Sequence, residues 1–91
     1  MKIKALVDVL SSNENCKHKD GTIEIGDGAE VSLYASLGSE TLVVGGLASI
    51  VVSDDVLLAN TRKGDTYALV AEDLRAVRVG KGKNERRTGL I

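Results

Sequence analysis

The adjacent glycines Gly45 and Gly46 interrupt the longest apolar run in the chain, TLVVGGLASIVV at residues 41–52. The run is too short to cross a membrane as a helix, which needs about 20 apolar residues. Paired glycines inside a strand mark a sharp bend, a bulge or the close approach of another backbone. A strand bent in its middle lets a short chain turn the corner of a small barrel. The run therefore predicts one strongly bent strand and no membrane partner.

Short alternating segments separated by turn residues flank this run. Residues 22–25 and 30–37 alternate apolar with polar side chains, and the Gly/Asp sequence at 26–29 lies between them. This combination predicts a β-hairpin. Three further turns are predicted at 38–40, 53–55 and 62–65. Together these signals predict about six short antiparallel strands.

Two interpretations remain open for the N-terminal segment at 2–10. Apolar and other residues alternate there with a period of two, which predicts a half-buried strand. A helix is the competing interpretation, because Ala5, Leu6 and Leu10 also suit one. The polar stretch at 11–21, which ends in Asp20 and Gly21, is predicted to be a loop. On the strand interpretation, Ile3, Ala5, Val7 and Val9 face one side and Lys2, Lys4, Leu6 and Asp8 the other.

Residues 66–79 also allow two structures. Strands at 66–70 and 74–79, separated by a short helical turn near Ala71–Leu74, suit the β-favouring residues and the turn that precedes them. A continuous short helix is the alternative, because Val70, Leu74 and Val77 have helical spacing. We favour the two strands.

The resulting order is a hairpin, a bent strand, an acidic turn, a second hairpin and a helical turn before the last strand. Over residues 30–79 this layout resembles the small barrels of the SH3-like and Sm-like class. The hairpins at 51–79 also resemble those of bacterial pleckstrin-homology-like domains, although the tail lacks the apolar periodicity of their final helix. The resemblance implies an all-β, small barrel-like domain. It rests on hydrophobic pattern, so no functional residue is transferred from either class.

The chain is predicted to form one domain at 1–79, followed by a basic flexible tail at 80–91. Its 91 residues include no Phe, Trp or Pro and only two Tyr. The core must therefore consist of Val, Leu, Ile and Ala, and such a thin core favours association with other copies. The single cysteine excludes an internal disulfide and favours a cytoplasmic protein.

Charge is distributed unevenly along the chain. The net charge is −6 over residues 1–74 and +5 over residues 75–91. A basic strip of this kind can neutralise phosphates, so nucleic-acid binding is the alternative function. The acidic body and the scarcity of aromatic residues count against it. The candidate residues are Arg75, Arg78, Lys81, Lys83, Arg86 and Arg87.

The residues that could perform chemistry are few. Cys16, His18 and Asp20 lie close together in the polar loop and are weak candidates for a metal site or a catalytic pair. A structural zinc site needs four ligands, usually in spaced Cys or His pairs. We therefore predict neither an enzyme nor a bound cofactor or metal.

The favoured function is a binding or assembly module that self-associates through strand edges. A different protein is the other partner that we consider. Strands at 41–52 and 74–79 are apolar and lack Pro, so an exposed edge would pair with another copy. The residues predicted to take part are Leu42, Val44, Leu47, Val77 and Val79.

Overall fold

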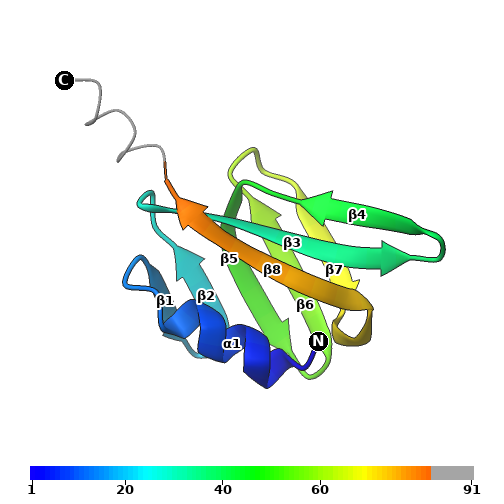
Figure 1. Cartoon of the computed structure of the whole chain (residues 1–91). Coiled ribbons are helices and arrows are strands. Elements are labelled where there is room, and N and C mark those ends of the chain that lie inside the picture. The colour runs from blue at the N-terminus through cyan, green and yellow to red at the C-terminus, as the bar shows by residue number, and fades with distance from the viewer. Residues whose placement is uncertain (83–91) are drawn as a thin grey trace.

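The computed structural model describes residues 1–82 as eight strands, one α-helix and one 3₁₀ turn (Figure 1). Lys83, Arg86 and Arg87 of the predicted tail lie outside the described residues. The elements are α1 (Ile3–Ser11), β1 (Cys16–Lys19), β2 (Thr22–Ile25), β3 (Ala29–Leu37), β4 (Glu40–Val44), β5 (Leu47–Ser53), β6 (Val56–Thr61), β7 (Thr66–Val70), η1 (Ala71–Asp73) and β8 (Leu74–Lys81).

The strands form two antiparallel sheets. Sheet A has the order β1-β2-β5-β6-β7, and sheet B has the order β4-β3-β8. The predominantly β fold is confirmed, but the sheets do not close into a barrel, because no strand of one sheet is hydrogen-bonded to a strand of the other. In Figure 1 sheet B lies in front of sheet A, with its strands crossing those behind. The estimate of about six strands was too low, because β1 was missed and the bent strand forms two strands.

The glycine pair makes the predicted bend and carries the chain from sheet B to sheet A. β4 ends at Val44 and β5 begins at Leu47. Gly46 has a φ of 62°, in the left-handed region that glycine adopts at low cost. A Cβ at Gly45 would lie 3.2 Å from the Oγ of Ser32, so the backbone of the bend approaches β3 closely.

The two-strand interpretation of residues 66–79 is confirmed, and the continuous helix is wrong. η1 is a single 3₁₀ turn at Ala71–Asp73 between β7 and β8. Leu74 is buried while Val70 is 40% exposed, so these side chains do not share an apolar face. The pairing of β8 with β3 shifts between Tyr34 and Ala35. β8 continues to Lys81, so two residues of the predicted tail belong to the sheet.

The N-terminal strand prediction was wrong, since this segment forms α1. Leu6 and Leu10 are completely buried, whereas Val9 is 46% exposed. The physical reason is that Ile3, Leu6, Val7 and Leu10 occur at i, i+3, i+4 and i+7, which is the spacing of one helical face. Within residues 1–82, no helix has the length and apolar content needed to cross a bilayer.

The predicted hairpin between 22–25 and 30–37 was also wrong. β2 pairs with β1 and with β5, and the next strand, β3, belongs to the other sheet. The actual hairpin joins β1 to β2 through Asp20 and Gly21, whose φ values are 52° and 79°. Two consecutive residues with positive φ suit the tight turns that connect paired strands. A strand therefore forms inside the predicted polar loop.

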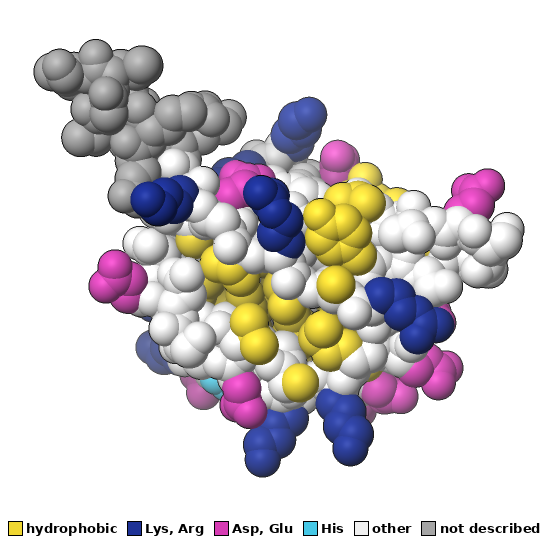
Figure 2. Space-filling model, in the orientation of Figure 1, with side chains coloured by type: hydrophobic (Ala, Val, Ile, Leu, Met, Phe, Trp, Pro, Cys, Tyr) yellow, Lys and Arg dark blue, Asp and Glu magenta, His cyan; other side chains and the backbone are white. Residues whose placement is uncertain are grey.

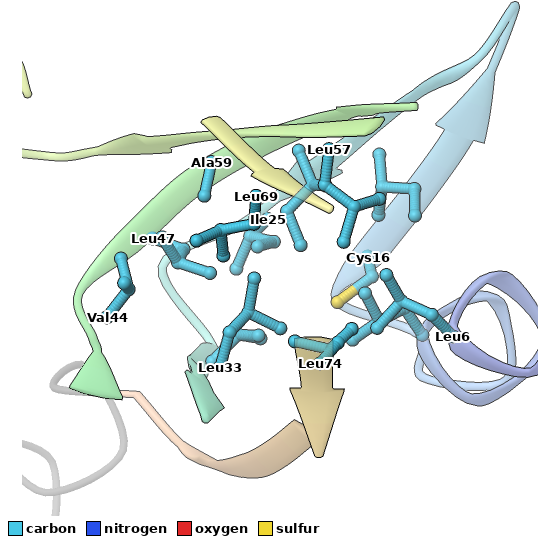
Figure 3. Packing of buried hydrophobic residues seen from close by; sticks show 14 of the residues in the cluster. Leu6, Cys16, Ile25, Leu33, Val44, Leu47, Leu57, Ala59, Leu69 and Leu74 are labelled. Carbon is cyan, nitrogen blue, oxygen red and sulfur yellow. The ribbon is translucent and has the colours of Figure 1, made fainter. Parts of the chain in front are cut away.

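The core lies between the two sheets and is closed at one side by α1 (Figure 3). Leu33 from sheet B and Leu57 from sheet A both belong to this buried cluster, and Leu6 of α1 lies close to Leu74. No Phe or Trp is available, so packing depends on aliphatic side chains of moderate size. The fully buried large side chains are Leu6, Leu10, Ile23, Leu33, Leu47, Ile50, Leu57, Leu74 and Val31.

Candidate functional site

The described residues contain four edge strands, and two of them carry charges along their length. β1 is a four-residue strand in which Lys17, His18 and Lys19 are exposed. β8 carries Arg75 and Arg78, which are both exposed. Short strands and charged side chains oppose the addition of another strand. These two edges are thus poorly suited to pair with a second copy.

The start of β8 is further occupied by the chain's own N-terminus. The amino group of Met1 donates hydrogen bonds to the carbonyl oxygens of Ala71, at 3.0 Å, and Leu74, at 2.7 Å. Figure 1 shows α1 running beside β8 in front of sheet A. This arrangement leaves β4 and β7 as the edges without such protection.

Of these two edges, β7 is the one without a charged residue, since β4 begins with Glu40. Its sequence TYALV contains no charged residue and no Pro. Its register with β6 runs without a bulge from Val56 opposite Val70 to Asn60 opposite Thr66. A neutral, regular edge strand is a template for another strand.

The hydrogen bonds at both ends of β7 show which backbone groups are free. The Ala71 N–H donates to the Asp55 carbonyl at 2.7 Å, and the Thr61 N–H donates to the Asp65 carbonyl at 2.8 Å. Because alternate residues in an antiparallel ladder bond to opposite sides, odd-numbered residues of β7 bond to β6. The N–H and C=O groups of Thr66, Ala68 and Val70 therefore point away from the sheet.

Apolar side chains surround this free edge on the outer face of sheet A. Val56, Leu58 and Val70 are 39%, 36% and 40% exposed. Val56 lies opposite Val70, and Leu58 lies opposite Ala68, so the three form one surface with the edge. We call them the β7 patch. On the inner face, Tyr67 is exposed while Leu69 is buried.

The residues predicted to mediate self-association face the interior of the domain. Val44 and Leu47 are buried in the core, and the other three are partly buried and pack against it. Their side chains therefore serve folding, while their strands contribute the β4 and β8 edges. The three partly buried residues are Leu42, Val77 and Val79.

A groove of about 560 Å³ lies beside the glycine bend, between β4 and the β6–β7 turn. Arg62 lines this groove and donates a hydrogen bond to the Gly26 carbonyl at 3.0 Å. It also forms ion pairs with Asp27, at 3.9 Å, and Glu30, at 3.7 Å. Glu30 in turn accepts a hydrogen bond from the Gly46 N–H at 3.1 Å. These contacts tie the bend to the start of β3, so Arg62 is engaged in structure.

The loop candidates for chemistry do not converge on a site. Cys16 is buried, whereas His18 and Asp20 are exposed. Within residues 1–82, no group of three or more His, Cys, Asp or Glu side chains is placed to hold a metal ion. Asp20 instead occupies the left-handed position of the β1–β2 turn.

Burial of Cys16 gives folding a specific pH dependence. Desolvation raises the pKa of its thiol. The stabilisation from keeping the thiol neutral is complete below the ordinary thiol pKa of about 8.5 and is lost as pH rises toward the folded value. We expect the urea midpoint to fall between about pH 8 and pH 9.5, and to fall less in Cys16→Ala. Equal slopes for the two proteins would contradict this assignment.

Three residues of the predicted basic strip, Arg75, Arg78 and Lys81, are exposed on β8.

The β7 patch was not predicted from the sequence. Val56 and Leu58 alternate with buried Leu57 and Ala59, so the pattern itself was visible. The exposure of Val56, Leu58 and Val70 in the structure shows that this part of the outer face is not covered by the described residues.

Comparisons with protein-family models, with curated proteins and with solved structures gave no match for this chain.

Proposed function

We propose that this protein is a small non-enzymatic assembly module that forms a symmetrical dimer by pairing β7 with β7 of a second copy. The observation that carries the proposal is the β7 edge, which is neutral and has no strand paired to its outer side within residues 1–82, while β1 and β8 are charged. A twofold arrangement uses the same surface on both copies and closes on itself. The two copies of sheet A would then form one continuous sheet.

The sequence of β7 suits antiparallel pairing about its centre. With Ala68 facing Ala68 of the second copy, Thr66 faces Val70, and every pair uses the N–H and C=O groups that point away from β6. On the outer face this register joins the two β7 patches. On the inner face it places Tyr67, which is 38% exposed, beside Leu69 of the second copy.

The small size of the domain supports a stabilising partner. A chain of this length buries only a little over about 60% of its unfolded surface. Pairing would satisfy backbone groups of β7 and bury apolar surface next to Val56 and Leu58. No charged side chain belongs to β7, so the attraction would be mainly hydrogen bonding and apolar contact.

The fold supports the narrower resemblance to SH3-like and Sm-like barrels in two respects, which we include in the proposal. The chain bends sharply at Gly45 and Gly46, and a 3₁₀ turn precedes the last strand. Compared with such a barrel, α1 and the β1–β2 hairpin would be additional elements that cover the side where the two sheets do not join. Small β folds of this class host many unrelated functions, so the proposal rests on the β7 edge and not on the fold.

Light scattering over a concentration series, at low and at high salt, tests the proposal. We expect a mass of twice the 9.6 kDa of one chain, with little change between the two salt concentrations. Since the pairing surface is uncharged, added salt has little electrostatic attraction to screen. A mass of 9.6 kDa at every concentration would refute the proposal, and a dimer that dissociates in salt would place the interface elsewhere.

A further inference from the structure

The outer face of sheet B presents one aromatic side chain, that of the partly exposed Tyr34. Leu33 and Ala35 of β3 are fully buried, so Tyr34 between them points outward. Tyr34 lies opposite Val43 of β4 and Ala76 of β8. Ser32 and Ser36 are its neighbours on the same face of β3. Because most of these neighbours are small, they leave room for another planar group beside the ring.

Cations accompany Tyr34 on this face. Arg78 lies opposite Ser32 and is therefore a diagonal neighbour of Tyr34, at a Cα separation of about 7–8 Å. Arg75 follows Leu74 where the pairing with β3 shifts, and it is exposed although Leu74 beside it is buried. Bulges of this kind redirect side chains. Figure 2, which views the molecule from the sheet B side, shows Lys and Arg side chains around exposed hydrophobic ones.

The acidic side chains that β3 and β4 contribute to this face are either paired or far from β8. Glu30 accepts a hydrogen bond from Gly46 and pairs with Arg62 at the edge of the groove. Glu40 lies at the tip of the β3–β4 hairpin, away from β8. Arg75 and Arg78 are therefore the charged side chains that β8 places beside Tyr34, while the exposed acidic residues Glu72 and Asp73 precede them in η1.

We infer that this face binds single-stranded nucleic acid, with one base stacked on Tyr34 and the adjacent phosphates held by Arg75 and Arg78. Stacking on aromatic residues beside a basic track is how sheets bind single strands. An acidic peptide would use the cations alone and would have no need of Tyr34. A duplex keeps its bases stacked inside and offers none to the ring.

The proposed nucleic-acid face is separate from the surface that pairs in the proposed dimer. Tyr34, Arg75 and Arg78 belong to sheet B, whereas the pairing edge belongs to sheet A. The two proposals can therefore fail separately. Each copy in a dimer would carry its own nucleic-acid face.

Fluorescence anisotropy with a labelled oligo(dT) of about 12 nucleotides tests the inference on the full chain. We expect Tyr34→Ala to weaken binding about tenfold, and Tyr34→Phe to bind like the native protein, because a phenyl ring still stacks. Arg78→Glu should weaken binding and flatten its salt dependence. Lys17→Glu is the matched control, since it makes the same charge change on the outer face of sheet A.

Four results would overturn the inference. They are no binding at low salt, native affinity in Tyr34→Ala, equal losses in Arg78→Glu and Lys17→Glu, and equal competition by polyglutamate at matched charge. The last would assign the cations to acidic partners in general. Circular dichroism of each variant verifies that it is folded, and Tyr34→Phe and Arg78→Glu keep the test decisive if Tyr34→Ala unfolds.

Discussion

Replacing Leu6 by Ala is expected to lower the free energy of unfolding by about 2–5 kcal/mol. Leu6 is completely buried among core residues that include Leu74 and Cys16 (Figure 3). Truncation would remove apolar contacts and leave a cavity between α1 and the sheets. For a domain whose total stability is about 5–15 kcal/mol, this loss would unfold a large part of the population under mild denaturation.

Leu6 has this importance because α1 has little stabilisation of its own. The helix is nine residues long, its N-cap Lys2 makes no side-chain hydrogen bond, and its first turn has no acidic residue. Isolated helices of this length are unstable in water, so packing must hold this one in place. The loss of Leu6 would therefore release the whole helix from the core.

Val9 provides the matched control on the same helix. It is 46% exposed, so Val9→Ala removes little buried surface and improves helix propensity. We expect its urea midpoint to stay close to that of the native protein. A strand at 2–10 would reverse the two results, because it would place Val9 inside and Leu6 outside. Unfolding curves of the two variants thus test the secondary structure as well as the packing.

Ala68→Pro is expected to convert the proposed dimer to a monomer without unfolding it. Proline removes the N–H at the centre of the β7 edge and places its ring where the second strand would lie. The Ala68 amide points away from β6, so the bonds within sheet A are kept. We expect the dimer dissociation constant to rise about a hundredfold, measured by light scattering or sedimentation.

His18→Pro is the control for this variant. By the same alternation, the His18 amide points away from β2, because the Asn15 carbonyl accepts from the Gly26 N–H across the ladder. The substitution therefore also removes an outward N–H from an edge strand, but from the charged edge β1. We expect its mass to remain that of the native protein. Dissociation by both prolines, or by neither, would contradict the assignment to β7.

The sequence predicted the bent strand and the final two strands because the conformational preferences of a few local residues determine both. Glycine is the residue that adopts the φ of Gly46 at low cost, and the turn at 62–65 lies between two apolar runs. The N-terminal segment failed because its apolar residues fit both a period of two and a helical face. The decision between them came from burial of Leu6 and Leu10, which is a tertiary effect.

The sequence suggested the type of candidate site, an exposed strand edge, but not which strand forms it. Edge pairing followed from apolar strands without Pro, but the residues chosen, such as Val44 and Leu47, proved to be core residues. Apolar content identifies strands without revealing which face is inward or which strand lies last in a sheet. β7 became the candidate edge only when the order of sheet A was known.

Amide hydrogen exchange at Ala68 and Val70 tests the central proposal most directly. Both amides point away from β6, and no strand within residues 1–82 bonds to them, so pairing with a second copy is expected to protect them. The proposed dimer predicts slow exchange at high protein concentration and fast exchange on dilution, while the outward His18 amide exchanges fast throughout. Fast exchange of Ala68 and Val70 at every concentration would contradict pairing through β7.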